Sequence, residues 1–112
     1  MKLYDTQILK TDENSLSSAK RILEEGGLVA FPTETVYGLG ANAFDGEAVK
    51  KIYEVKGRPQ DNPLIVHVAH REALAEFACP DERAKALIET FWPGPLTMVL
   101  PKKDVVPNEV SA

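Results

Sequence analysis

Residues 32–40 form a short segment that combines several side chains suited to ligand binding, directly after an apolar stretch. Thr33 and Thr35 carry hydroxyls that donate and accept hydrogen bonds, and Tyr37 adds an apolar ring with a polar tip. Gly38 and Gly40 let the backbone approach a ligand closely. Ligand sites in α/β sheets tend to lie beyond the carboxyl ends of strands, so this loop is a candidate small-molecule site. The alternative is a plain strand-to-helix turn with a threonine capping bond.

Residues 56–63 form a second loop, and it is basic and flanked by prolines. Arg58 and Asn62 each precede a proline, which steers their backbone toward extended conformations and leaves the loop less freedom to lose on binding. Arg58 offers a fork of donors that suits phosphate oxygens, and Lys56 supplies a compact second cation. The loop is therefore a candidate triphosphate site. Otherwise Lys56 complements a helix C-terminus and Arg58 is a solvated surface cation.

His67 lies within the apolar segment 64–68, where it shares a strand face with Ile65. A single histidine in a strand is more often a hydrogen-bonded core or rim residue than a catalytic group, but His67 follows the basic loop closely. Cys79 has no nearby cysteine or nucleophile motif and is expected to be structural. The acidic residues form no zinc or EF-hand pattern, so no metal site in the protein is predicted. No Walker A or GxGxxG sequence is present.

The composition is that of an ordinary globular protein, with 44% hydrophobic and 27% charged residues. The net charge of −4 argues against a surface built to hold nucleic acid non-specifically. No apolar run approaches the roughly 20 residues of a membrane span, and the N-terminus has no apolar signal-peptide core. A single cysteine excludes an intramolecular disulfide. These features predict a cytoplasmic protein without a membrane partner, and a single domain over residues 1–112.

Strand and helix signals alternate along the chain, which predicts an α/β (α+β) fold with a twisted mixed sheet flanked by helices. Strands are expected at 4–9, 28–31, 64–68 and 96–100, and residues 32–40 are expected to be a loop. The first helix is expected to be capped by Asn14 or Ser15 and to end at Gly26–Gly27.

Three further helices are expected in the second part of the chain. Asp45 caps the first of these, which presents Ala48, Ile52 and Val55 inward and ends near Gly57. A short helix covers 72–78. The last begins near Asp81, carries an apolar stripe and ends at prolines 93 and 95. Its stripe consists of Ala84, Leu87, Ile88 and Phe91. Residues 105–112 show no clear element, so the domain is expected to be incomplete at its C-terminus.

Taken together, four stretches of this sequence resemble the YrdC-like family in order and spacing. The stretches are 26–40, 52–59, 61–68 and 91–97. The resemblance implies a twisted sheet that encloses a concave active site. It also implies that L-threonine, bicarbonate and ATP are converted to L-threonylcarbamoyl-AMP and pyrophosphate. The product would feed N6-threonylcarbamoylation of adenosine 37 in tRNA, with tRNA-modification proteins as partners.

The resemblance also assigns roles to particular residues. Thr35 and His67 would contact L-threonine, with Tyr37 lining the pocket. Lys56 and Arg58 form the family's K-x-R element and would act in catalysis, and together with Asn62 they would bind ATP. Mg²⁺ is expected to be held mainly by the ATP phosphates, with few protein ligands.

The family's second signature, a Ser/Thr-x-Asn element, lies beyond residue 112, as does an arginine that helps to hold threonine. The 112-residue chain is therefore expected to be inactive or weak by itself. Three alternatives remain open: a double-stranded RNA or tRNA-binding module, a non-catalytic folded fragment, and a YrdC-like domain of a hydrogenase maturation protein.

Overall fold

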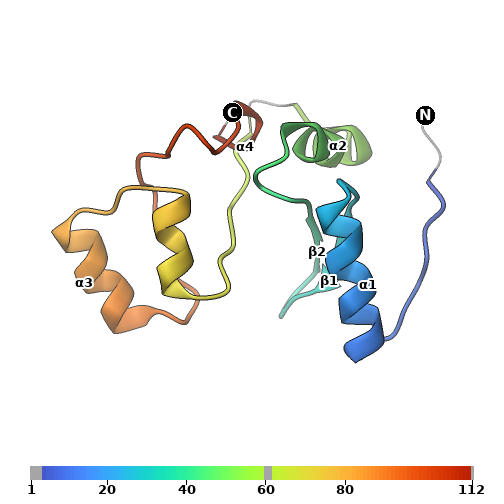
Figure 1. Cartoon of the computed structure of the whole chain (residues 1–112), viewed down its shortest axis with the longest axis horizontal. Helices are drawn as coiled ribbons and strands as arrows, with labels where there is room; N and C mark the ends of the chain where they lie inside the picture. The colour runs from blue at the N-terminus through green and yellow to red at the C-terminus, as the bar shows by residue number, and fades with distance from the viewer. Residues whose placement is uncertain (1–3, 60–61, 112) are drawn as a thin grey trace.

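The computed structural model describes residues 4–59 and 62–111. Its elements are α1 (Glu13–Glu24), β1 (Val29–Pro32), β2 (Tyr37–Gly40), α2 (Gly46–Lys56), the 3₁₀ helix η1 (Arg71–Glu76), α3 (Glu82–Phe91) and α4 (Asn108–Ser111). Figure 1 shows two groups of elements: a first lobe of α1, β1, β2 and α2, and a second lobe of η1 and α3. The short helix α4 lies between them, next to α2. The expected alternation of helical and extended segments is confirmed.

The first helix begins two residues earlier than the predicted caps. The carboxylate of Asp12 accepts a hydrogen bond from the Ser15 backbone N–H at 2.8 Å, and the Ser15 hydroxyl accepts one from the Asp12 N–H at 2.9 Å. This reciprocal pair satisfies two backbone donors at once, so Asp12 is the cap and the prediction of Asn14 or Ser15 was wrong. The predicted end is confirmed at Gly26, which has φ +86°.

Strands β1 and β2 form an antiparallel hairpin, so the prediction that residues 32–40 are a loop was wrong for its second half. Phe31 pairs with Gly38, and a Cβ at Gly38 would lie 2.7 Å from the Phe31 ring. Glycine is therefore needed where the aromatic ring crosses the neighbouring strand. Sequence patterns miss this strand because glycine is normally a strand breaker. The turn is reduced to residues 33–36.

The other predicted strands do not join a sheet in the described part of the chain. Residues 4–10 form no regular element and are exposed. Residues 64–68 and 96–100 alternate between half-buried and exposed positions, as a strand pattern requires, but they form no ladder. The Leu64 N–H donates instead to the Val110 carbonyl at 2.9 Å. The prediction of paired strands there was wrong, because alternation orients side chains but does not supply a hydrogen-bonded neighbour.

Helix α2 begins and ends as predicted. The Asp45 carboxylate accepts hydrogen bonds from the backbone N–H groups of Glu47 and Ala48, and Gly57 ends the helix with φ +63°. Its buried residues are Ala48, Val49, Ile52 and Tyr53. Val55 is 49% exposed, so its predicted inward position was wrong. The cluster that covers α2 packs on Val49 and Tyr53 and leaves Val55 outside.

The second lobe differs from the prediction in detail. The helix expected at 72–78 is the 3₁₀ helix η1. Asp81 caps α3 through the Ala84 N–H, but Leu87 and Phe91 are exposed, so only part of the predicted stripe is buried. Residues expected to lack an element contain α4, whose Val110 is buried. Val110 joins Val49, Tyr53 and Val106 in the main hydrophobic cluster.

Candidate functional site

The turn between β1 and β2 is organised by the side chain of Thr33. Its hydroxyl accepts hydrogen bonds from the backbone N–H groups of Thr35 and Val36, at 3.4 and 3.2 Å, and donates to the Val36 carbonyl. Such a network fixes a turn from within. Thr33 is therefore occupied by the fold. Thr35 is exposed, and its hydroxyl bonds to nothing in the described part of the chain. Of the two predicted hydroxyls, Thr35 is the one available to a ligand.

Tyr37 opens β2 directly after this turn and is 77% exposed. Its ring is exposed to solvent, as a side chain that lines an open site must be. The prediction that Tyr37 lines a threonine pocket stays a prediction.

Four cations gather on and after α2: Lys50, Lys51, Lys56 and Arg58. Lys50 pairs with Glu47 at 3.1 Å, and this hydrogen bond raises the pKa of Lys50 above its ordinary value. Lys51 donates to the Gly26 carbonyl at 2.7 Å, at the C-terminus of α1. Both are therefore engaged within the fold.

Lys56 and Arg58 differ from the other two cations of the cluster. Both are exposed, and neither forms an ion pair with any residue that the structure describes. Their charges are thus available to an anion. These are the two residues of the K-x-R element, and among the described residues they have no ion-pair partner, whereas Lys50 and Lys51 are bonded within the fold.

The backbone of the basic loop is held at both of its ends. The Arg58 N–H donates to the Tyr53 carbonyl at 3.1 Å, and the Tyr53 hydroxyl donates to the Asn62 carbonyl at 2.7 Å. The side chains of Arg58 and Asn62 remain exposed. Gln60 and Asp61, within the predicted loop, lie outside the described residues.

His67 is exposed, and its Nδ1 lies 3.2 Å from the Ile65 carbonyl. A hydrogen bond there places a proton on Nδ1, and in the neutral imidazole Nε2 is then an acceptor. An acceptor suits the ammonium or hydroxyl of an amino acid such as threonine. The predicted alternation is confirmed, because Ile65 and His67 are exposed while Leu64, Val66 and Val68 are half-buried.

The predicted residues therefore fall into separate groups. In the described ranges 4–59 and 62–111, no hydrogen bond or ion pair links the threonine turn to the basic loop or to His67. Tyr53, which joins the two ends of the basic loop, was missed by the functional prediction. Its signal was present: it lies four residues after Val49, so the helical period places these two apolar residues on the same face of α2.

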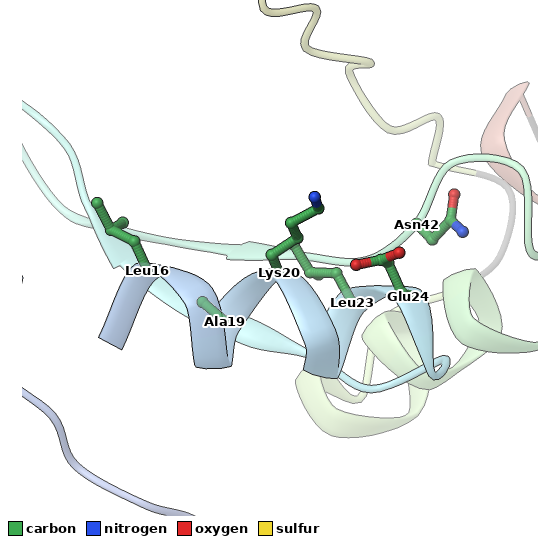
Figure 2. A pocket seen from close by; sticks show the side chains of 6 residues that line it. All are labelled: Leu16, Ala19, Lys20, Leu23, Glu24 and Asn42. Atoms are coloured by element: carbon green, nitrogen blue, oxygen red, sulfur yellow. The ribbon is translucent and has the colours of Figure 1, made fainter. Parts of the chain in front are cut away.

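A hollow on the described surface lies away from the predicted site residues. It measures about 490 Å³ and is open on one side. Figure 2 shows that one face of α1 lines it together with Asn42, which lies after β2. The lining residues are Leu16, Ala19, Lys20, Leu23, Glu24 and Asn42. None of the predicted site residues is among them.

The described residues contain no group of three His, Cys, Asp or Glu side chains placed to hold a metal ion. Among the same residues, no helix is both long enough and apolar enough to cross a membrane.

Helices alternating with extended segments, a threonine turn and an exposed K-x-R pair together define an α/β domain with an exposed basic loop. A family model for Sua5, YciO and YrdC proteins, described as "Telomere recombination", matches residues 21–112. The chain belongs to this family.

Relatives with a stated activity are similar over nearly the whole chain. A threonylcarbamoyl-AMP synthase of Pyrococcus abyssi is 56% identical over 104 residues, covering 91% of this chain and 30% of that protein. The Bacillus subtilis protein of the same name is 53% identical over 109 residues, covering 96% of this chain and 32% of that protein. The chain thus spans about a third of the length of these relatives.

Solved structures agree with this fold. The P. abyssi Sua5 protein in complex with L-threonine superposes with a TM-score of 0.83 at 55% identity, over 91% of this chain and 30% of that one. The MTH1692 protein of Methanobacterium thermoautotrophicum gives a TM-score of 0.68 at 34% identity, over 98% of this chain and 53% of that one.

Proposed function

We propose that this chain supplies the K-x-R loop and the threonine turn of a threonylcarbamoyl-AMP synthase. The observation that carries the proposal is the pair Lys56 and Arg58, exposed and without an ion pair to any described residue, in a chain 55% identical to a Sua5 structure that holds L-threonine. The proposed substrates are L-threonine, bicarbonate and ATP. The proposed compartment is the cytoplasm, and the product would pass to tRNA-modification proteins and tRNA.

The proposed reaction has two steps. The threonine amine adds to bicarbonate and loses water, giving a carbamate. A carbamate oxygen then attacks the α-phosphorus of ATP, a P–O bond to the β-phosphate breaks, and pyrophosphate leaves. The catalytic demand is placement of the two substrates and neutralisation of the phosphate charge.

Each residue of the site has a part in this reaction. Lys56 and Arg58 neutralise the phosphates, and Asn62 contributes a neutral donor and acceptor. Thr35 and His67 contact L-threonine, and Tyr37 lines its site. Mg²⁺, carried by the phosphates, would add further charge neutralisation. No described cluster of three metal-ligand side chains competes for it.

Calorimetric titration with Mg²⁺–ATP tests the proposed role of the loop. We expect Arg58→Ala to weaken binding by about tenfold or more, because a charged hydrogen bond is lost. The matched control is Arg83→Ala, since the Arg83 side chain is 93% exposed on α3. Equal losses in both variants, or no loss at Arg58, would contradict the proposal.

Pyrophosphate release tests the reaction itself. We expect release that requires both threonine and bicarbonate, at a low rate for the 112-residue chain. Release that continues when threonine or bicarbonate is left out would contradict the proposed synthase reaction.

A further inference from the structure

We propose that Tyr53 is a positioning residue for nucleotide binding, because it anchors both ends of the loop that carries Arg58 and Asn62. This inference rests on the proposed function of that loop. It adds a residue that makes no contact with ATP itself: Tyr53 is 2% exposed and belongs to the hydrophobic cluster of α2 and α4.

The first anchor is a backbone bond at the start of the loop. Gly57 ends α2 in a left-handed conformation, and the Arg58 N–H then donates to the Tyr53 carbonyl at 3.1 Å. This is the bond pattern of a helix C-terminus closed by glycine. It fixes the direction in which the chain leaves α2, and so sets where the Arg58 side chain begins.

The second anchor is the phenol at the far end of the loop. The Tyr53 hydroxyl lies 2.7 Å from the Asn62 carbonyl and 2.9 Å from the Glu109 carbonyl. A phenol has a single proton to donate, so the two carbonyls share it. The hydroxyl therefore ties the loop to α4 as well as to α2. The neighbouring bond from the Leu64 N–H to the Val110 carbonyl strengthens the same tie.

The bonds to Tyr53 hold the backbone at Arg58 and Asn62 and leave the side chains of both residues exposed. Arg58 and Asn62 are both exposed, although their main-chain groups are bonded to one buried residue. A backbone that is already fixed at Arg58 and Asn62 loses less conformational entropy at these two positions when a ligand binds. The hydroxyl of Tyr53 thus favours nucleotide binding without touching the nucleotide. A phenylalanine would pack in the same cluster but could not make the second anchor.

The test compares Tyr53→Phe with wild type and with Val49→Ala, a variant in the same cluster one helical turn away. We expect Tyr53→Phe to raise the dissociation constant for Mg²⁺–ATP about three- to tenfold, as expected for the loss of one ordering hydrogen bond. L-threonine affinity should stay unchanged. Val49→Ala should lower the unfolding midpoint but leave both affinities as they are. Unaltered ATP affinity in Tyr53→Phe, or equal losses for ATP and threonine, would overturn the proposal.

Amide hydrogen exchange provides a readout that does not depend on the variant's affinity. In Tyr53→Phe the amides of Asn62 and Leu64 should exchange at least about tenfold faster, because their segment is released. The Arg58 amide, bonded to the main-chain carbonyl, should change little. Unchanged exchange at the amides of Asn62 and Leu64 would contradict the claim that the Tyr53 hydroxyl anchors this segment.

Wild-type measurements separate this inference from the proposed function. Mg²⁺–ATP should slow exchange at the amides of Asn62 and Leu64. Binding of ATP without that protection would contradict the role of Tyr53 alone. Absence of any ATP binding would contradict the proposed function, and the positioning role with it.

Discussion

At the scale of single residues, the fold decides which polar side chains remain available for chemistry. Thr33 closes the hairpin turn with its own hydroxyl, and Lys51 holds the C-terminus of α1. Thr35, Lys56 and Arg58 have no such task among the residues that the structure describes. A residue type identifies a candidate, whereas its hydrogen-bond partners decide whether it can serve a ligand.

The first prediction at this scale concerns Thr33. Replacing it with valine removes the hydroxyl but keeps the shape, so the turn loses the bonds that present Thr35. We expect Thr33→Val to weaken L-threonine binding about threefold or more, and Thr33→Ser to keep it. Titration followed by NMR measures both affinities. Equal binding by the valine and serine variants would show that the turn is ordered by other means.

The residues of the candidate site could be predicted from sequence more completely than their hydrogen-bond and ion-pair partners. Both loops and His67 were proposed as candidates from residue types, prolines and glycines. The distinction between Lys50, which pairs with Glu47, and Lys56, which forms no ion pair with a described residue, could not be predicted. That distinction depends on side-chain partners, and partners such as Glu109 lie far away in the sequence.

At the scale of elements, the helix termini carry the clearest agreement between sequence and structure. Asp45 caps α2 as predicted, and α3 begins directly after Asp81, where a helix start was expected; in both helices a carboxylate before an amphipathic segment satisfies free backbone N–H groups. Strands were less predictable. Segments 64–68 and 96–100 have the right alternation but no paired neighbour in the described chain, and β2 was hidden by its glycines.

The element-scale prediction uses the cap of α3. A hydrogen bond from the Ala84 N–H, at 2.8 Å, lowers the pKa of Asp81 below its ordinary value of about 3.9. A carboxylate with a lowered folded-state pKa stabilises the protein above that ordinary value, and the contribution is lost as the pH falls through the folded-state pKa. We therefore expect wild type to lose more stability than Asp81→Asn as the pH drops from about 5 to about 2.

Urea unfolding at a series of pH values measures this difference. Asparagine keeps an acceptor for the Ala84 N–H and cannot titrate, so it separates the cap from its charge. Parallel pH curves for the two proteins would show that the Asp81 charge does not contribute.

At the scale of the whole molecule, the chain is open in shape. Its radius of gyration is 15.1 Å, compared with about 13 Å for a compact domain of this length. Its accessible surface is 8742 Å², whereas a compact monomer of this mass exposes about 6,100 Å². Several apolar side chains are almost fully exposed, among them Val99 at 99% and Ile8 at 96%. Stability therefore depends on a small number of buried residues.

The whole-molecule prediction compares two valines. Val49 is 2% exposed and packs in the main cluster, whereas Val99 is 99% exposed. Val49→Ala should lower the free energy of unfolding by about 2 kcal/mol, because two buried methyl groups are lost and a cavity remains. Val99→Ala should change it by less than about 0.5 kcal/mol. Thermal or urea unfolding followed at Trp92 measures both, and similar losses would contradict the assignment of the core.

One further contact joins the two lobes. Phe44, in the segment before α2, stacks on Phe77, which follows η1, with ring centroids 4.6 Å apart and planes inclined by 14°. Nearly parallel rings can slide across one another at small cost, but tilting them apart exposes both faces to water. The stacked pair Phe44 and Phe77 should therefore allow the two lobes to slide past each other and resist a hinge motion that opens them.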